Sequence, residues 1–155
     1  MIEGAEEIIA EFQRTFSGGV PIQHERRVAP HRAGTLPAGM CGVYVFSLSH
    51  ANGTSCPAGP GFVLKVGLAG PNSNARWNAH HYGINRAPST LARKLIDGTE
   101  HWASLGIVAL SPSDVGEWLR QSTDRDHFLF REEDRAVSAY FEKFLQDRLH
   151  PLFEG

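Results

Sequence analysis

The chain lacks several features that would place it in a common class of protein. It has two cysteines in 155 residues, Cys41 and Cys56, without a CxxC pair, which excludes a multi-cysteine zinc site and a disulfide-rich scaffold. We expect both to be free thiols, with Cys41 buried. The motifs G-x-x-x-x-G-K-[ST], G-x-G-x-x-G and G-x-S-x-G are absent, so P-loop, dinucleotide-binding and α/β-hydrolase sites are not indicated.

The sequence also lacks segments that address a protein to a membrane. No apolar run approaches the ~18 residues that a membrane span requires. The N-terminal stretch MIEGAEEIIAEFQRTF is acidic and amphipathic, unlike a signal peptide with its basic start and apolar centre. We therefore expect a cytoplasmic protein that does not associate with membranes. The length predicts a single compact domain, large enough to bury a core without disulfides.

Carboxylates are missing from the whole middle of the chain. Residues 26–96 contain eight Arg and Lys residues and no Asp or Glu, a formal charge of +8. Residues 1–25 carry a net charge of −4 and residues 97–155 a net charge of −6, so the total of −2 masks the basic segment. This distribution indicates one face that attracts a polyanion, and clustering of surface charge by chance is the alternative interpretation.

Periodicity predicts a small α+β protein, with a three-stranded antiparallel β-sheet flanked by helices and an extra N-terminal helix. Residues 17–39 are rich in Gly, Pro and Arg, and we interpret them as loop with at most short extended pieces. The β-branched and aromatic runs at 40–49 and 62–67 predict two strands of an antiparallel hairpin. The other expected elements are helices at 3–16, 72–83, 88–98, 112–121 and 131–149 and a third strand at 105–110.

Four sequence features then occur in a meaningful order. GVY stands at 42–44 and KVG at 65–67, each on an expected strand, and Arg76 and His80 share one face of the next helix. Glu142 follows on the last helix, nine residues before Pro151. This order and spacing resemble the GIY-YIG nuclease superfamily over roughly residues 40–153. Each feature alone is weak, because a Tyr on a strand is usually a packing residue and a Glu on a helix is usually solvated.

The resemblance implies a nuclease domain over residues 40–155, preceded by an N-terminal helix and basic loop extension at 1–39. In this family the two tripeptides lie on the first two strands, and a Glu equivalent to Glu142 binds one divalent metal, Mg²⁺ or Mn²⁺. A Tyr equivalent to Tyr44, or a neighbouring His such as His80, is proposed to take the proton from the attacking water. The resemblance therefore implies a DNA endonuclease that depends on a metal.

The chemistry of the residues agrees with that activity. A guanidinium such as that of Arg76 forms two parallel hydrogen bonds to a phosphate and stays charged. Hard oxygen ligation by Glu142 suits Mg²⁺ or Mn²⁺, which keep most of their water ligands. Between the two candidate bases, His80 has the ordinary pKa nearer neutrality, about 6.5 against about 10 for Tyr44. We assign the general base and the positioning of water to these two residues jointly.

The sequence departs from the family pattern in two places. Lys65 stands where the second tripeptide usually begins with Tyr. Some branches of the superfamily also have Lys at this position. It adds a positive charge beside the phosphate and could position or deprotonate the water, so the identity of the general base stays open. Glu154 stands where many members have Asn, so any role of that Asn is lost or replaced.

Partners and specificity are predicted less sharply. We expect double- or single-stranded DNA as the main partner, contacted by a set of basic residues in the carboxylate-free segment: Arg26, Arg27, Arg32, Arg86, Arg93 and Lys94. A homodimer or a separate partner protein could supply specificity. Two alternatives remain: a catalytically idle module that kept the fold for DNA binding or regulation, with Lys65 as a sign of the lost chemistry, and an enzyme that cuts RNA.

Overall fold

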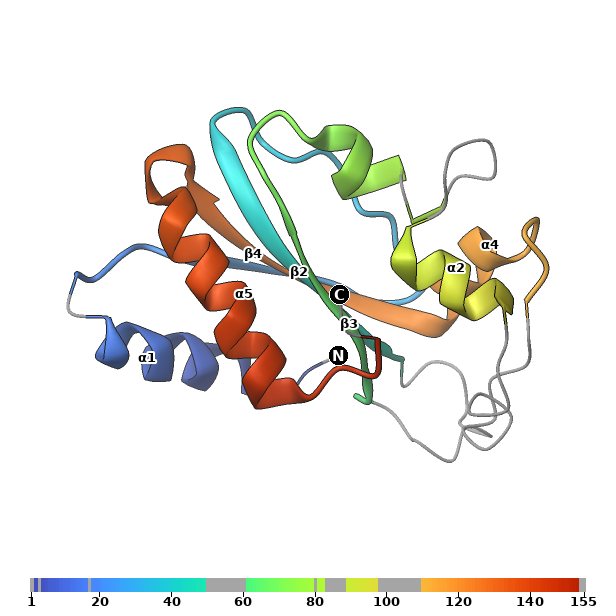
Figure 1. Ribbon diagram of the computed structural model, residues 1–155, viewed down its shortest axis with the longest axis horizontal. Coiled ribbons are helices and arrows are strands. Elements are labelled where there is room, and N and C mark those ends of the chain that lie inside the picture. Colours follow the sequence, from blue (N-terminus) through green and yellow to red (C-terminus); the bar gives the residue numbers. More distant parts are fainter. Residues whose placement is uncertain are drawn as a thin grey trace.

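Four antiparallel strands form the framework of the molecule (Figure 1). They are β1 (Gln23–Arg27), β2 (Met40–Leu48), β3 (Val63–Ala69) and β4 (Thr123–Arg131), in the spatial order β1-β4-β2-β3. The predicted α+β class is confirmed, but the sheet that the described residues form has four strands rather than three. This computed structural model describes residues 2, 4–16, 18–49, 61–79, 81–82, 89–97 and 110–153.

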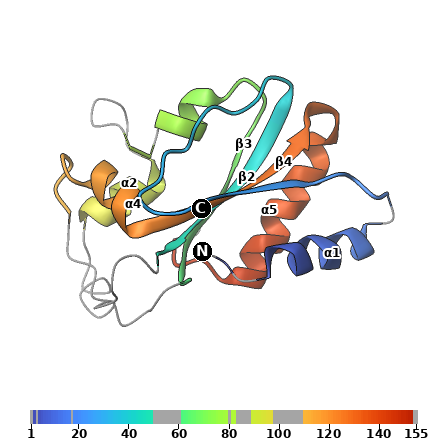
Figure 2. The same ribbon diagram turned by 180° about the vertical axis from the view of Figure 1, so that it is seen from behind.

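Helices cover both faces of the sheet, as the two opposite views show (Figures 1 and 2). On one face lie α1 (Ala5–Thr15) and α5 (Arg135–Leu149), which follows the short 3₁₀ helix η3 (Glu132–Asp134). The other face carries the π-helix η2 (Ala75–Ala79), α2 (Thr90–Asp97) and α4 (Val115–Ser122). None of the helices that the structure describes is long and apolar enough to span a membrane.

The central strands are buried on both sides because each face has its own core. Side chains of β2 alternate between the two: Tyr44 and Phe46 pack under η2 and α2, whereas Val43 and Val45 pack under α1 and α5. Cys41 is a free, fully buried thiol in the second core, as expected. The sequence pattern located the hairpin of β2 and β3 correctly, and these strands pair in antiparallel register.

One strand, β4, was not anticipated, because it falls between two expected helices. β1 is a five-residue strand within the segment that we interpreted as loop with at most short extended pieces. The third strand expected at 105–110 lies outside the described residues, apart from Leu110, which belongs to no strand. The helix expected at 72–83 is represented in the described part by the five residues of η2. Neither β1 nor β4 shows the apolar alternation by which strands are recognised.

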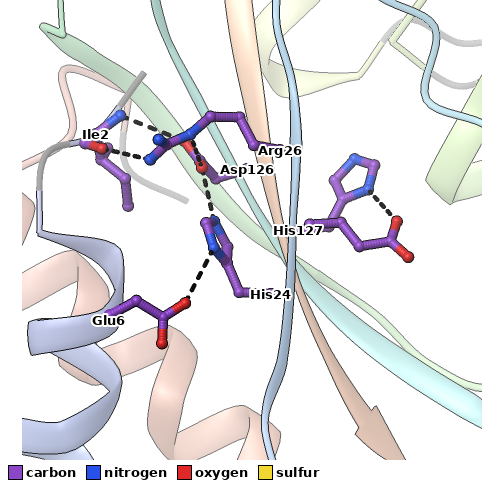
Figure 3. A network of polar contacts seen from close by, with 7 residues as sticks. Ile2, Glu6, His24, Arg26, Asp126 and His127 are labelled. Atoms are coloured by element: carbon purple, nitrogen blue, oxygen red, sulfur yellow. Dashed lines mark hydrogen bonds and ion pairs between the residues drawn. The ribbon is translucent and has the colours of Figure 1, made fainter.

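β4 has a polar sequence, TDRDHFLFR, yet all of its residues except Arg131 are buried. Asp126, fully buried, explains how this is possible (Figure 3). Its carboxylate accepts hydrogen bonds from Nε2 of His24 at 2.8 Å, from Nε of Arg26 at 2.9 Å and from the backbone N–H of Ile2 at 3.3 Å. These bonds join β4 to β1 and to the segment before α1, so the polar side chains specify the strand pairing.

Candidate functional site

Both glycines of the two tripeptides lie directly against an aromatic ring. Tyr44 on β2 is opposite Gly67 on β3, and a Cβ atom on Gly67 would lie 2.5 Å from Cζ of Tyr44. A Cβ atom on Gly42 would likewise lie 2.5 Å from Cζ3 of Trp77 on η2. Real Cβ contacts are never so short. The glycines therefore allow the Tyr44 ring to cross β3 and allow η2 to lie close to the sheet.

Four predicted site residues come together from four different elements. Tyr44 is on β2, Lys65 on β3, Arg76 on η2 and Glu142 on α5. The Arg76 side chain hydrogen-bonds to Tyr44, and the charges of Arg76 and Lys65 act on Glu142. Because β3 is an edge strand, this cluster lies where the two helical layers meet at one side of the sheet.

The Tyr44 hydroxyl is held among positive charges but has little access to water. The side chain is only 2% exposed, and this burial raises its pKa above the ordinary value. The charges of Arg125 and Arg76 and the hydrogen bond from Arg76 oppose that rise, whereas the Glu142 carboxylate adds to it. Tyr44 is therefore a protonated hydroxyl at neutral pH, close to groups that would stabilise a phenolate.

Lys65 and Glu142 are shifted toward their neutral forms. Burial lowers the pKa of Lys65, and the neighbouring charges of Arg76 and Lys94 lower it further, while Glu142 opposes the shift. Burial raises the pKa of Glu142, and the charges of Arg76 and Lys65 counteract this effect. A buried amine with a depressed pKa and a half-buried carboxyl with a raised one are typical of residues that exchange protons or bind a cation.

The donor set suits a divalent metal in one particular way. Among the described residues, no group of three or more His, Cys, Asp and Glu side chains could hold an ion. Glu142 alone offers a hard oxygen ligand in the cluster, which fits Mg²⁺ because that ion usually keeps several waters and takes one or two carboxylates plus substrate phosphates. The adjacent charges of Arg76 and Lys65 would repel the cation. The cluster thus fits a metal together with an anionic substrate better than a metal alone.

Arg125 on β4 is a component of the site that the sequence did not reveal. Its side chain is fully buried, with the guanidinium carbon 4.8 Å from the ring centres of Tyr44 and Trp77 and 5.1 Å from that of Phe46. Nη1 donates a hydrogen bond to the Tyr82 hydroxyl at 3.2 Å. Nε and Nη2 have no hydrogen-bond partner among the described residues. The sequence around Arg125 is polar and suggests a loop, so its position beside Tyr44 could be found only from the fold.

The other predicted site residues are placed as follows. His80 and Arg86 lie outside the described residues. Arg93 is on α2 and exposed, whereas Lys94 on the same helix lies 5.8 Å above the Phe153 ring and close enough to Lys65 to affect its pKa. The remaining three belong to β1 or the loop after it: Arg26, Arg27 and Arg32.

These three arginines differ in their availability to a ligand. Arg26 is bonded to Asp126 and donates from Nη2 to the carbonyl oxygen of Ile2 at 2.7 Å, so its charge is neutralised inside the protein. Arg27 is exposed and pairs with Glu25 at 3.3 Å. Arg32 is exposed and forms no ion pair with any described residue. Of the three, Arg32 is the one best placed to contact an anion from solution.

His127 and His31 are buried on the same face of the sheet as Tyr44. Burial lowers the pKa of His127 to about 2, helped by the charge of Arg125, and lowers that of His31 to about 4. Both are therefore neutral imidazoles at pH 7. His31 accepts or donates a hydrogen bond at 2.8 Å with the Tyr82 hydroxyl, which places it in a structural role.

Comparison with known proteins adds no relative: no protein-family model, curated protein or solved structure matches this chain.

Proposed function

We propose that this protein is a metal-dependent endonuclease of GIY-YIG type that hydrolyses phosphodiester bonds of DNA. One observation carries the proposal: Tyr44, Lys65, Arg76 and Glu142, which lie far apart in the sequence, form a single electrostatic cluster at one edge of the sheet. The resemblance in sequence order implied this convergence, and a chance match of short motifs would not be expected to produce it. The two glycines that receive aromatic rings support the same assignment.

In this mechanism Arg76 binds the phosphate that is cut. It lies on η2, is hydrogen-bonded to Tyr44 and is exposed, so its guanidinium can bind two phosphoryl oxygens from solution. An arginine that stabilises the charge of a phosphoryl-transfer transition state contributes roughly 10³–10⁵ in rate in comparable enzymes. Replacing Arg76 should therefore reduce the rate far more than it reduces DNA affinity.

Lys65 and Tyr44 handle the proton of the water. The water oxygen forms a bond to phosphorus, the bond from phosphorus to the 3′ oxygen breaks, and one water proton passes to the protein. The amine of Lys65 can accept this proton, directly or through the Tyr44 hydroxyl, after losing its own proton, a loss that burial favours. The leaving 3′ oxygen takes a proton from solvent. His80 remains a second candidate base.

Glu142 would hold the metal, Mg²⁺ or Mn²⁺, which when bound supplies compensation for negative charge on the leaving 3′ oxygen. The carboxylate form that such an ion requires is opposed by burial and favoured by Arg76 and Lys65. Among the described basic residues, Arg27, Arg32, Arg93 and Lys94 are the ones proposed to contact the DNA backbone. Arg26 is not included among these DNA contacts, because its guanidinium is already hydrogen-bonded to the Asp126 carboxylate.

The proposal is tested by incubating the protein with supercoiled plasmid, single-stranded DNA and RNA in the presence of Mg²⁺, Mn²⁺ or EDTA. We expect metal-dependent nicking of DNA that Arg76→Ala and Glu142→Gln reduce by at least about 10³-fold. Matched controls are Arg131→Ala and Lys143→Ala, whose side chains are 63% and 68% exposed. These controls should keep the activity of the unmodified protein.

Other outcomes separate the alternatives. Absence of cleavage, with equal DNA binding by the unmodified protein and both site variants, would contradict the nuclease assignment and favour the idle binding module. Cleavage of RNA but not DNA would contradict DNA as the substrate and favour the alternative of an enzyme that cuts RNA. Cleavage that Arg76→Ala and Glu142→Gln leave intact would show that the chemistry occurs elsewhere.

A further inference from the structure

A second concave site lies beside η2, the helix that also carries Arg76 of the candidate cluster. It is a pocket of about 520 Å³ between the loop that joins β1 to β2, the helix η2 and the helix α4. Its lining includes Arg32 and Thr35 from the loop, Asn78 from η2, and Glu117 and Arg120 from α4. The volume is within the range of pockets that take small organic ligands. Because Asn78 is two residues after Arg76, η2 forms a wall of both sites.

The walls of this pocket are fastened to one another by hydrogen bonds. The backbone N–H of His31 donates to the carbonyl oxygen of Arg120 at 3.0 Å, which ties the loop to α4. The backbone N–H of Leu36 donates to the side-chain carbonyl of Asn74 at 2.8 Å, which ties the same loop to the start of η2. A pocket held at both rims is preorganised, so a ligand would lose little affinity to ordering the protein.

Tyr82 lines the pocket, and hydrogen bonds of its hydroxyl hold the side chain in place. Its side chain is 8% exposed, and its hydroxyl hydrogen-bonds to His31 and to the buried Arg125. The Arg120 guanidinium lies over the Tyr82 ring, 4.9 Å from its centre, and this side chain is 37% exposed. Its outer face is therefore a flat cationic surface that is open to the pocket.

The chemistry of the lining matches one nucleotide. Guanidinium planes stack on nucleobases, which gives Arg120 a base to cover. The amide of Asn78 both donates and accepts hydrogen bonds, as the edge of a base requires. Arg32, exposed and without an ion pair among the described residues, suits a phosphate. Glu117, the acid in the lining, lies 3.9 Å from Arg120, so Arg32 leaves the lining with an excess of positive charge.

We propose that this pocket binds one unpaired nucleotide of the DNA strand, and that the protein therefore prefers DNA containing a bulged or extruded nucleotide to fully paired duplex. A pocket of this size admits a single nucleotide and not a stacked base pair within a helix. Extruding a paired nucleotide costs a few kcal/mol, so a substrate in which it is already unpaired is favoured. The proposal rests on DNA being the substrate, and it assigns to the pocket the specificity that the catalytic cluster lacks.

The test measures binding of two dye-labelled DNA duplexes in EDTA, one fully paired and one with a single bulged deoxyadenosine. Stacking of one base is worth ~1–3 kcal/mol, so we expect the unmodified protein to prefer the bulged duplex by at least about fivefold. Thr35→Glu places a negative charge in the pocket at an exposed position, and it should abolish the preference. Thr35→Gln introduces a side chain of almost the same shape as Glu but without its charge, and this variant should retain the preference.

Arg120→Ala gives an independent second variant, because it removes the stacking surface. It should also remove the preference, with circular dichroism used to confirm the fold. Equal binding of both duplexes by the unmodified protein, or a preference that survives Thr35→Glu and Arg120→Ala, would overturn the proposal.

Cleavage measured separately with Mn²⁺ distinguishes this inference from the proposed function. A protein that selects the bulged duplex but cuts neither substrate contradicts the nuclease and keeps the pocket. A protein that cuts both duplexes equally contradicts the pocket and keeps the nuclease. Failure to bind either duplex would contradict both the proposed nuclease function and the proposed nucleotide pocket.

Discussion

Gly67 has no side chain at the point where the Tyr44 ring crosses β3, and this absence sets the position of the tyrosine. The strand register places the two residues opposite each other, and the first atom of any side chain at 67 would overlap the ring. Tyr44 in turn contacts Arg76 and the buried Arg125. A change at Gly67 therefore tests the geometry of the cluster without removing any of its functional groups.

We predict that Gly67→Ala lowers DNA cleavage by about 10²-fold, because a displacement of about 1 Å in a catalytic group can cost that much. Overpacking of this kind also destabilises the fold by about 1–3 kcal/mol. Gly70→Ala is the matched control, since a Cβ atom there would lie 3.5 Å from Nη2 of Arg135, an ordinary contact. Rates and urea unfolding of the two variants should differ; equal activity would mean that the ring position is unimportant for catalysis.

At the scale of whole elements, β1 and β4 show how polar side chains can hold a strand pair. Residues of β1 pair with residues of β4 from Gln23 opposite Leu129 to Arg27 opposite Arg125. Asp126 lies inside this pairing and bonds to His24 and Arg26 across it. Burial raises the pKa of Asp126, but the hydrogen bond from His24 and the charge and hydrogen bond of Arg26 hold it below the ordinary value of 3.8.

We predict that Asp126→Asn destabilises the protein by about 2–4 kcal/mol at pH 7, because it leaves the partly buried Arg26 without its counter-charge. The pKa of Asp126 is lower in the folded state than in the unfolded state. Its contribution is therefore complete above about pH 4 and is lost as the pH falls further, through the pKa of the folded state. Urea unfolding at several pH values should show the difference between the proteins shrinking in acid.

Asp147→Asn is the control for this prediction, since Asp147 is 71% exposed and pairs with Lys143 on the surface. Its effect should stay near zero at every pH. A difference between Asp126→Asn and the unmodified protein that is independent of pH below 4 would contradict the assignment of this carboxylate as ionised and bonded.

The sequence predicted those elements whose packing follows simple periodicity. α1, the β2–β3 hairpin and the approximate extent of α2, α4 and α5 all have apolar spacing that matches their structure. β4 could not be predicted, because Asp124, Arg125, Asp126 and His127 form a polar run whose burial depends on partners distant in the sequence. For the same reason the candidate site was predicted in its motif residues but not in Arg125, and the pocket wall at Arg120 had no sequence signal.

At the scale of the whole molecule, the candidate cluster joins residues from opposite faces of the sheet. The carboxylate-free segment 26–96 supplies β3 with Lys65 and η2 with Arg76, whereas α5, which carries Glu142, forms a second layer with α1 on the opposite face. Glu142 reaches from this second layer to Lys65 and Arg76. The candidate catalytic cluster is therefore a place where two basic side chains of the carboxylate-free segment meet a carboxylate from the opposite layer.

This arrangement predicts that metal binding depends on DNA. A divalent cation alone would meet the charges of Lys65 and Arg76 next to Glu142, whereas a phosphate bound by Arg76 supplies compensating negative charge. Mn²⁺ alone should raise the melting temperature only slightly. Mn²⁺ together with a duplex that cannot be cleaved should raise it by more than the sum of the separate effects.

The matched variants are Lys65→Met and Glu142→Gln. Removing the positive charge of Lys65 should increase the shift that Mn²⁺ produces without DNA, because less repulsion opposes the cation beside the carboxylate. Glu142→Gln should abolish the extra shift while leaving the effect of DNA alone. A large shift with Mn²⁺ alone in the unmodified protein, unchanged in Glu142→Gln, would place the metal elsewhere and separate it from the cluster of Tyr44, Arg76 and Lys65.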